Sequence, residues 1–145
     1  MTDFELYKLC LKYGYHVNED SCDNNEQIET YFRDNGRLKP NTILNMYIDI
    51  PEQLCDWYDE IYTSSISLTI SRNYASETCI SIYLYQFYDD IDIKNKNLPL
   101  INNINYECNV ENINKDILID IIKKNVLFAK KCKILYKKLN LDEEL

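Results

Sequence analysis

Two stretches of alternating apolar residues, joined by a short polar segment, constrain the fold most. In residues 65–71 isoleucine and leucine alternate with serine and threonine. In residues 78–88 isoleucine and leucine again occupy every second position, and several of the intervening residues are larger, mainly tyrosine and phenylalanine. A period of two is typical of a strand that packs one face on a core. The two stretches therefore predict a β-hairpin. Because both faces of its second strand carry apolar or aromatic side chains, that strand is expected in the interior of a sheet.

The face of that strand formed by Tyr83, Tyr85 and Phe87 has two interpretations. Either the rest of this chain covers both faces of the strand, or this aromatic face contacts a partner. Tyrosine supplies a large, stiff contact area with a polar tip and is enriched in protein interfaces. The chain has 13 tyrosines, with many asparagines and isoleucines, a pattern that AT-rich codon usage also produces. Such codon usage occurs in many large DNA viruses, in amoebae, in some parasites and in low-GC bacteria.

The spacing of apolar residues predicts the remaining elements. Apolar residues three and four positions apart predict helices at about residues 3–13, 25–34 and 115–139, and from Pro51 to Ile61. Alternation predicts further strands at Leu44–Ile50 and Ile104–Val110. The expected fold is α+β, with about four strands in a mainly antiparallel sheet around a central hairpin, packed against N-terminal helices and a long C-terminal helix. Residues 1–145 are expected to form a single compact domain.

Composition excludes several classes of function. The formal charge of -8 and a pI near 4.6 oppose non-specific attraction to nucleic acid or anionic lipid. The two glycines, Gly14 and Gly36, are too far apart for a P-loop or a dinucleotide-binding fingerprint. The acidic first residues do not resemble a signal peptide, and no segment has the length of an apolar membrane span. The protein is therefore expected in the cytoplasm, or in the host cytoplasm if it is viral.

The cysteines indicate neither a metal site nor a redox motif. More than ten residues separate each of the six from the next, so none forms the close pair of a zinc knuckle or a CxxC motif. A chain that can bury an apolar core does not need disulfides. Buried free thiols are the expectation, and no cofactor or metal is predicted.

Three groups of residues are candidates for catalysis or metal binding. A Cys–His nucleophile needs a structured cleft, a carboxylate pair needs a pocket that separates two pKa values, and acidic loop clusters are usually solvated turns. None of these features is evident around the three groups. They are His16 with Cys10 or Cys22, Asp56 with Asp59 and Glu60, and the cluster Asp89, Asp90 and Asp92.

The predicted C-terminal helix carries the most information about function. Residues 1–110 hold 8 Lys and Arg against 18 Asp and Glu, a net charge of -10, whereas residues 111–145 hold 8 against 6, a net charge of +2. On this helix two lysine rows repeat every seven residues, with two apolar residues between them, opposite the predicted core stripe. We call these residues the lysine ridge: Lys123, Lys124, Leu127, Lys130, Lys131, Ile134, Lys137 and Lys138.

The lysine ridge has three interpretations. It is a solvated face whose side-chain stems cover Leu127 and Ile134 and whose charge balances the acidic body. Alternatively, it docks in an acidic or mixed groove of another protein, as amphipathic helices commonly do. Contact with phosphate or anionic lipid is the third interpretation.

The sequence as a whole favours a non-enzymatic protein-binding module that occupies or sequesters a partner. A viral antagonist of host signalling and an immunity protein that neutralises a toxin are two examples, and a homodimer is compatible with the pattern. One alternative is a small metal-assisted enzyme or regulatory domain that uses Asp89, Asp90 and Asp92. The other is an acidic DNA mimic, against which the 16 basic residues argue.

Overall fold

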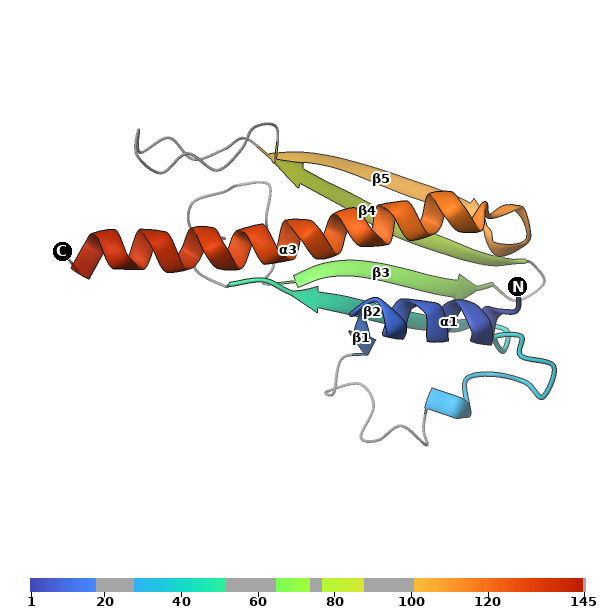
Figure 1. Cartoon of the computed structure of the whole chain (residues 1–145). Coiled ribbons are helices and arrows are strands. Elements are labelled where there is room, and N and C mark those ends of the chain that lie inside the picture. The colour runs from blue at the N-terminus through green and yellow to red at the C-terminus, as the bar shows by residue number, and fades with distance from the viewer. Residues whose placement is uncertain (18–27, 52–64, 74–76, 88–100, 145) are drawn as a thin grey trace.

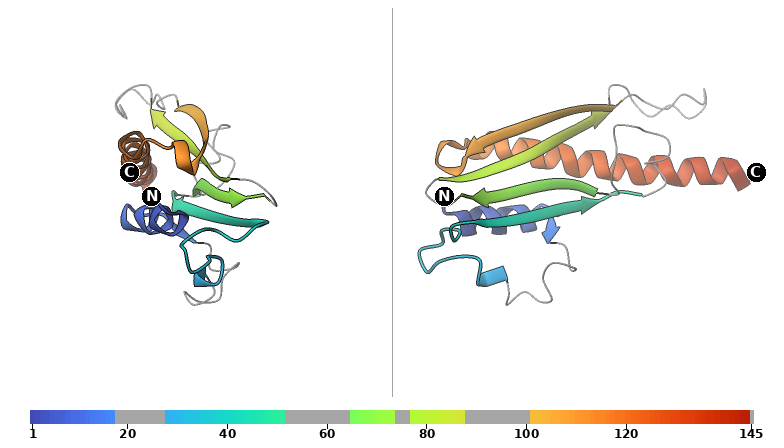
Figure 2. Two further views of the ribbon diagram at one scale, coloured as in Figure 1. Left: turned by 90° about the vertical axis from the view of Figure 1, so that its right-hand side faces the viewer. Right: turned by 180° about the vertical axis from the view of Figure 1, so that it is seen from behind.

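The computed structural model describes residues 1–17, 28–51, 65–73, 77–87 and 101–144 (Figure 1). Five strands form one antiparallel sheet in the order β1-β2-β3-β4-β5. The helices α1 and α3 both lie against the same face of this sheet (Figures 1 and 2). In chain order the elements are α1 Asp3–Lys12, β1 His16–Val17, β2 Thr42–Asp49, β3 Ser65–Arg72, β4 Thr78–Phe87, β5 Ile101–Asn109, the 3-10 helix η2 Val110–Asn112 and α3 Lys115–Glu144.

Helix α1 begins with a reciprocal capping box. The backbone N–H of Glu5 donates to Thr2 Oγ1 over 3.1 Å, and the backbone N–H of Thr2 donates to Glu5 Oε2 over 3.2 Å. These bonds satisfy donors that the first turn of a helix leaves without partners. The helix ends at Lys12, and the chain turns away at Gly14, whose φ of 115° is readily adopted only by glycine.

A buried carboxylate fixes the start of α1 to two distant parts of the chain. Asp3 Oδ2 accepts hydrogen bonds from the backbone N–H of Leu38 over 2.7 Å and from Thr78 Oγ1 over 2.6 Å. Asp3 and Thr78 are both buried. The first turn of α1, the chain before β2 and the start of β4 therefore meet at one oxygen atom.

The core lies between the sheet and the two helices. Alternate residues of β2, β3 and β4 point toward the helices and are buried. The strand residues of this core are Leu44, Met46, Ile48, Ile66, Leu68, Ile70, Ile80, Ile82 and Leu84. Helix α3 contributes Leu118, Ile121, Ile122, Asn125, Phe128, Ala129, Cys132 and Leu135.

Helix α3 starts at an asparagine cap and runs lengthwise along the sheet, beside β4 (Figure 1). Asn114 Oδ1 accepts from the backbone N–H groups of Asp116 and Ile117, which have no partner inside the helix. A helix of 30 residues is about 45 Å long at 1.5 Å per residue. In Figure 1 its C-terminal turns extend past the ends of β2 and β3.

Strands β3 and β4 separate part of the way along the hairpin. Their register runs from Arg72 opposite Thr78 to Leu68 opposite Ile82, and from Tyr83 onward β5 is the only described strand that pairs with β4. The fully buried Asn125 of α3 occupies this gap. Its Oδ1 accepts from the N–H of Tyr85 over 3.0 Å, and its Nδ2 donates to the carbonyl of Tyr83 over 2.7 Å. The side-chain amide thus replaces the backbone partner that β3 no longer supplies.

The predicted α+β class, the hairpin and the interior position of its second strand are confirmed. Within the described residues the sheet has five strands, close to the predicted number of about four, and the additional one is the two-residue strand β1, for which no strand was predicted. The C-terminal helix extends to Glu144, beyond the predicted end near residue 139. The predicted helix from Pro51 to Ile61 lies almost entirely outside the described residues.

The predicted extent of the helix at residues 25–34 is wrong in its described part. Only Ile28 and Glu29 have helical backbone there, and a turn follows at Thr30. Phe32 then forms an isolated antiparallel bridge with Leu38. The two apolar residues that suggested a helical face, Tyr31 and Phe32, instead enter a tight loop. Among the helices that the structure describes, none is apolar enough over a sufficient length to cross a membrane.

Candidate functional site

The two lysine rows of the ridge lie on different sides of α3. Lys124 and Lys131 line a pocket against the end of β4. Lys123, in the other row, places its Nζ 5.9 Å from the ring centre of Tyr13, at the end of α1. A lysine over an aromatic face is attracted to the ring quadrupole. The structure therefore divides the ridge into a row beside β4 and a row that begins beside α1.

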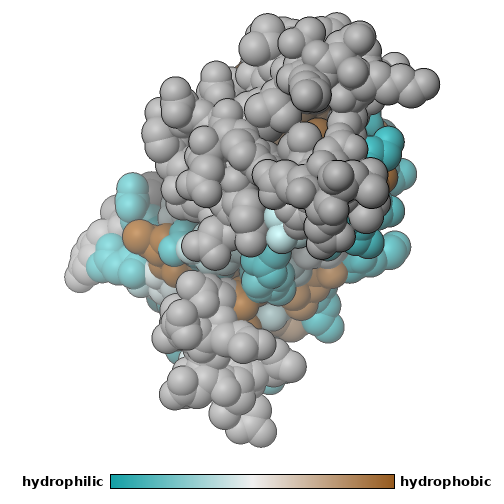
Figure 3. Space-filling view, turned by 90° about the vertical axis from the view of Figure 1, so that its left-hand side faces the viewer, coloured by the Kyte–Doolittle hydropathy of each residue, from teal (hydrophilic) through white to brown (hydrophobic). Residues whose placement is uncertain are grey.

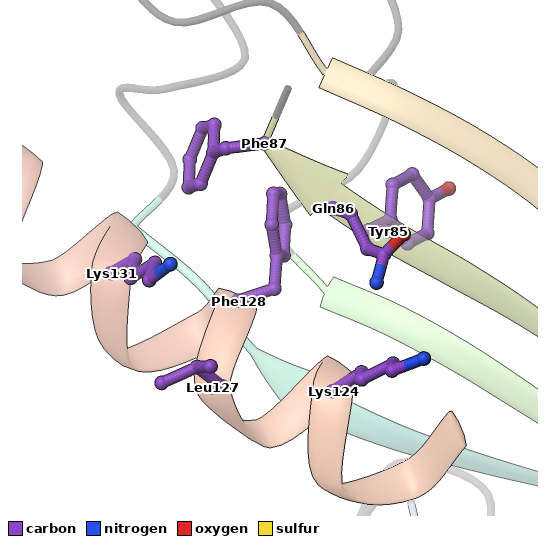
Figure 4. A pocket seen from close by; sticks show the side chains of 7 residues that line it. All are labelled: Tyr85, Gln86, Phe87, Lys124, Leu127, Phe128 and Lys131. Carbon is purple, nitrogen blue, oxygen red and sulfur yellow. The ribbon is translucent and has the colours of Figure 1, made fainter. Parts of the chain in front are cut away.

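The row beside β4 meets the aromatic face that the hairpin pattern singled out. Figure 4 shows Phe128 projecting from α3 beside Phe87, with Tyr85 and Gln86 on the adjoining part of β4. Lys124 and Lys131 lie on the helix turns before and after Phe128. The pocket is open to solvent on one side and has a volume of about 190 Å³. We call this site the β4–α3 pocket, lined by Tyr85, Gln86, Phe87, Lys124, Leu127, Phe128 and Lys131.

Aromatic contacts form the apolar wall of the β4–α3 pocket. The ring centre of Phe128 lies 4.7 Å from that of Phe87 and 5.6 Å from that of Tyr85, and the Tyr85 and Phe128 rings are stacked. Phe128 is buried, whereas Tyr85 and Phe87 are half-buried. Burial, with a smaller contribution from Tyr83, raises the pKa of Tyr85. The Tyr85 hydroxyl thus stays neutral near pH 7 and can both donate and accept a hydrogen bond.

The helix side of the pocket combines positive charge with exposed apolar surface. Lys124 Nζ lies 3.0 Å from Asp120 Oδ2, an exposed pair four residues apart on the helix. Leu127 is 51% exposed, and Ile134, two turns further along, is 48% exposed. Figure 3 views the molecule from the left-hand side of Figure 1, the side toward which the C-terminal end of α3 points. The coloured surface in this view shows hydrophilic and hydrophobic residues side by side.

The structure brings together five residues that the sequence placed in two separate candidate surfaces: Tyr85, Phe87, Lys124, Leu127 and Lys131. Two lining residues were not predicted. Phe128 was assigned to the core stripe, where it also belongs, and Gln86 had no distinguishing pattern. Six predicted residues lie outside the lining of this pocket: Tyr83, Lys123, Lys130, Ile134, Lys137 and Lys138.

The described catalytic and metal-binding candidates do not converge. His16 Nε2 lies 3.0 Å from Asp49 Oδ2 in an exposed pair on β1 and β2, while Cys10 is fully buried in α1. Among the described residues, no three His, Cys, Asp or Glu side chains are placed to share a metal ion. Two sets of predicted candidates, together with Cys22, lie outside the described residues: Asp56 with Asp59 and Glu60, and Asp89 with Asp90 and Asp92.

The described cysteines should differ sharply in reactivity. Burial raises the pKa of both Cys10 and Cys132 to about 12, so both thiols stay protonated at pH 8. Cys79 and Cys108 are exposed. We expect iodoacetamide at pH 8 to label Cys79 and Cys108 in the native protein and to spare Cys10 and Cys132, with peptide mass spectrometry as the measurement. Equal labelling of all four without denaturant would contradict this account of the core.

The site thus belongs to an α+β protein in which the last strand of a hairpin and a long C-terminal helix enclose a small, lysine-flanked aromatic pocket. Comparison of the chain with models of protein families, with curated protein sequences and with solved structures found no match.

Proposed function

We propose that the protein is a non-enzymatic protein-binding module that occupies a surface of a partner through the β4–α3 pocket. The pocket receives an apolar side chain of the partner, and Lys124 and Lys131 pair with acidic groups on either side of it. The partner surface is therefore acidic or mixed. Antagonism of host signalling by a virus and neutralisation of a toxin by an immunity protein are two settings that fit this activity.

The observation that carries the proposal is the meeting of the aromatic strand end with one lysine row at a pocket of this size. Small-molecule sites typically enclose about 300 to 1,000 Å³, whereas this pocket encloses about 190 Å³. Such a volume suits a single side chain better than a cofactor. An aromatic pocket surrounded by charged groups is also the arrangement that concentrates binding energy in protein interfaces.

Exposed Leu127 supports the same proposal. An apolar side chain between two lysines on the outer part of a helix gains nothing from water, but it adds contact area when a partner covers it. A helix that offers apolar anchors with a charged rim matches the recognition of amphipathic helices in grooves. The lysines supply orientation and rate of association, and the apolar residues supply affinity.

The test is affinity capture from extracts of the source cell with two charge-matched double variants as baits. One carries Lys124→Glu and Lys131→Glu, in the row that lines the pocket. The other carries Lys130→Glu and Lys137→Glu, in the opposite row of the same helix. Both change the net charge equally, and Lys124→Glu additionally breaks the exposed pair with Asp120.

We expect the Lys124 and Lys131 variant to recover at least about tenfold less partner than wild type, and the Lys130 and Lys137 variant to recover nearly as much as wild type. Quantitative mass spectrometry of the captured proteins is the measurement. Unchanged far-ultraviolet circular dichroism shows that both variants are folded. Equal recovery by the two variants would count against the pocket as the contact site.

A further inference from the structure

The last strand of the sheet, β5, presents an edge with few of the features that keep such edges from pairing. Within the described residues no strand pairs with the outer side of β5. Its nine residues keep an unbroken register with β4, from Phe87 opposite Ile101 to Cys79 opposite Asn109, so no bulge interrupts it. It contains one charged residue, Glu107, and no proline. Native edge strands are usually protected by lysine, proline, a bulge or a very short length.

The helix-side face of β5 is apolar but only partly covered. Ile104, Tyr106 and Cys108 stand opposite the buried residues Leu84, Ile82 and Ile80 of β4. Yet Ile104 is 41% exposed and Tyr106 is 39% exposed. The core therefore ends at β5 with apolar side chains still open to water. An additional strand beside β5 would cover them and would pair with backbone groups on the side of β5 that no described strand occupies.

We propose that β5 is a self-association edge, at which a second copy of this chain adds its own β5 in antiparallel register. The register centred on Asn105 places Ile104 of one copy opposite Tyr106 of the other and Glu107 opposite Asn103. It joins the two exposed apolar residues of this face, Ile104 and Tyr106, across the axis and sets no like charges against each other. The result is one continuous sheet across a two-fold axis, the symmetry typical of a dimer.

The β5 edge is separate from the β4–α3 pocket, so this proposal does not depend on the proposed partner site. The two kinds of binding can also be told apart, because salt should affect them in opposite directions. Each chain carries a charge of -8, so two copies repel each other, and salt that screens this repulsion strengthens the dimer. Binding of an acidic partner to Lys124 and Lys131 weakens under the same change. Failure of one proposal is therefore distinguishable from failure of the other.

Sedimentation equilibrium of the purified chain tests the dimer. From about 1 µM to about 1 mM, the span of moderate to weak protein affinities, we expect the mass to rise from 17.3 kDa toward twice that value. Tyr106→Lys puts a charge on the edge strand and should keep the chain monomeric. Ile43→Lys is the matched control on β2, since Ile43 is 64% exposed and its variant should associate like wild type.

Hydrogen exchange reports whether the backbone of β5 takes part. We expect amides within residues 101–109 to exchange more slowly at the high concentration than at the low one, in wild type and in Ile43→Lys but not in Tyr106→Lys. Circular dichroism verifies that each variant is folded. A wild-type mass of 17.3 kDa at every concentration, or dimerisation that Ile43→Lys abolishes and Tyr106→Lys leaves intact, would overturn the proposal.

Discussion

Replacing Asn125 with leucine should lower the free energy of unfolding by about 4 kcal/mol, because leucine keeps the volume but leaves one buried and two partly buried polar groups without partners. These groups are the Tyr83 carbonyl, the Tyr85 N–H and the hydroxyl of Tyr15, to which Asn125 Nδ2 donates over 2.9 Å. Native domains are stable by only about 5 to 15 kcal/mol, so the loss is a large fraction of the total. Urea unfolding followed by circular dichroism measures it.

Tyr15→Phe is the graded control for this prediction. It removes one of the three hydrogen bonds and keeps the ring that fills the core, so the expected loss is about 1 kcal/mol. Tyr15 is fully buried, and burial raises the pKa of its hydroxyl, which therefore remains a neutral partner for Asn125 at ordinary pH. Similar stabilities for Asn125→Leu and wild type would show that the Asn125 amide does not hold β4 against α3.

The second large effect is expected at Asp3. Asp3→Ala removes the oxygen that accepts from both the Leu38 N–H and Thr78 Oγ1, leaving two buried donors unsatisfied. We expect unfolding to become easier by about 3 kcal/mol. The loss of an acidic side chain from the first turn of α1 adds a smaller cost of about 0.5 kcal/mol through the helix dipole. Urea unfolding at pH 7 measures the combined effect.

Asp3→Asn separates the hydrogen bonds from the charge. Both bonds use the same carboxylate oxygen, so the carbonyl oxygen of an asparagine side chain can accept both. Asp3→Asn should therefore cost no more than about 1 to 1.5 kcal/mol, the difference between charged and neutral acceptors. If Asp3→Asn were as unstable as Asp3→Ala, the negative charge rather than the two hydrogen bonds would be responsible.

Alternation and helical spacing predicted most of the elements because they record which side chains meet the core. The hairpin strands and the core stripe of α3, including Phe128, followed from these periods alone. Strand β1 was not predicted, because two residues are too few to show a period. The loop after Ile28 was not predicted, because Tyr31 and Phe32 have helical spacing. In the structure Tyr31 lies in a turn and Phe32 forms the bridge to Leu38.

The candidate site was predicted in parts but not as a whole. Spacing marked Lys124, Leu127 and Lys131 on one helix, and alternation marked Tyr85 and Phe87 on one strand. Neither pattern specifies how α3 is positioned against β4. That position depends on the point at which β4 stops pairing with β3. Asn125, which occupies that gap, interrupts an apolar stripe with an asparagine. Its role depends on Tyr83 and Tyr85, residues 40 and more positions away along the chain.

The central claim, that the β4–α3 pocket binds a partner protein, is tested most directly by titration calorimetry with the purified partner. For Lys124→Glu with Lys131→Glu we expect a dissociation constant at least about tenfold higher than for wild type. For Lys130→Glu with Lys137→Glu we expect a constant within about twofold of wild type. Equal weakening by both variants, or no weakening by either, would contradict the claim.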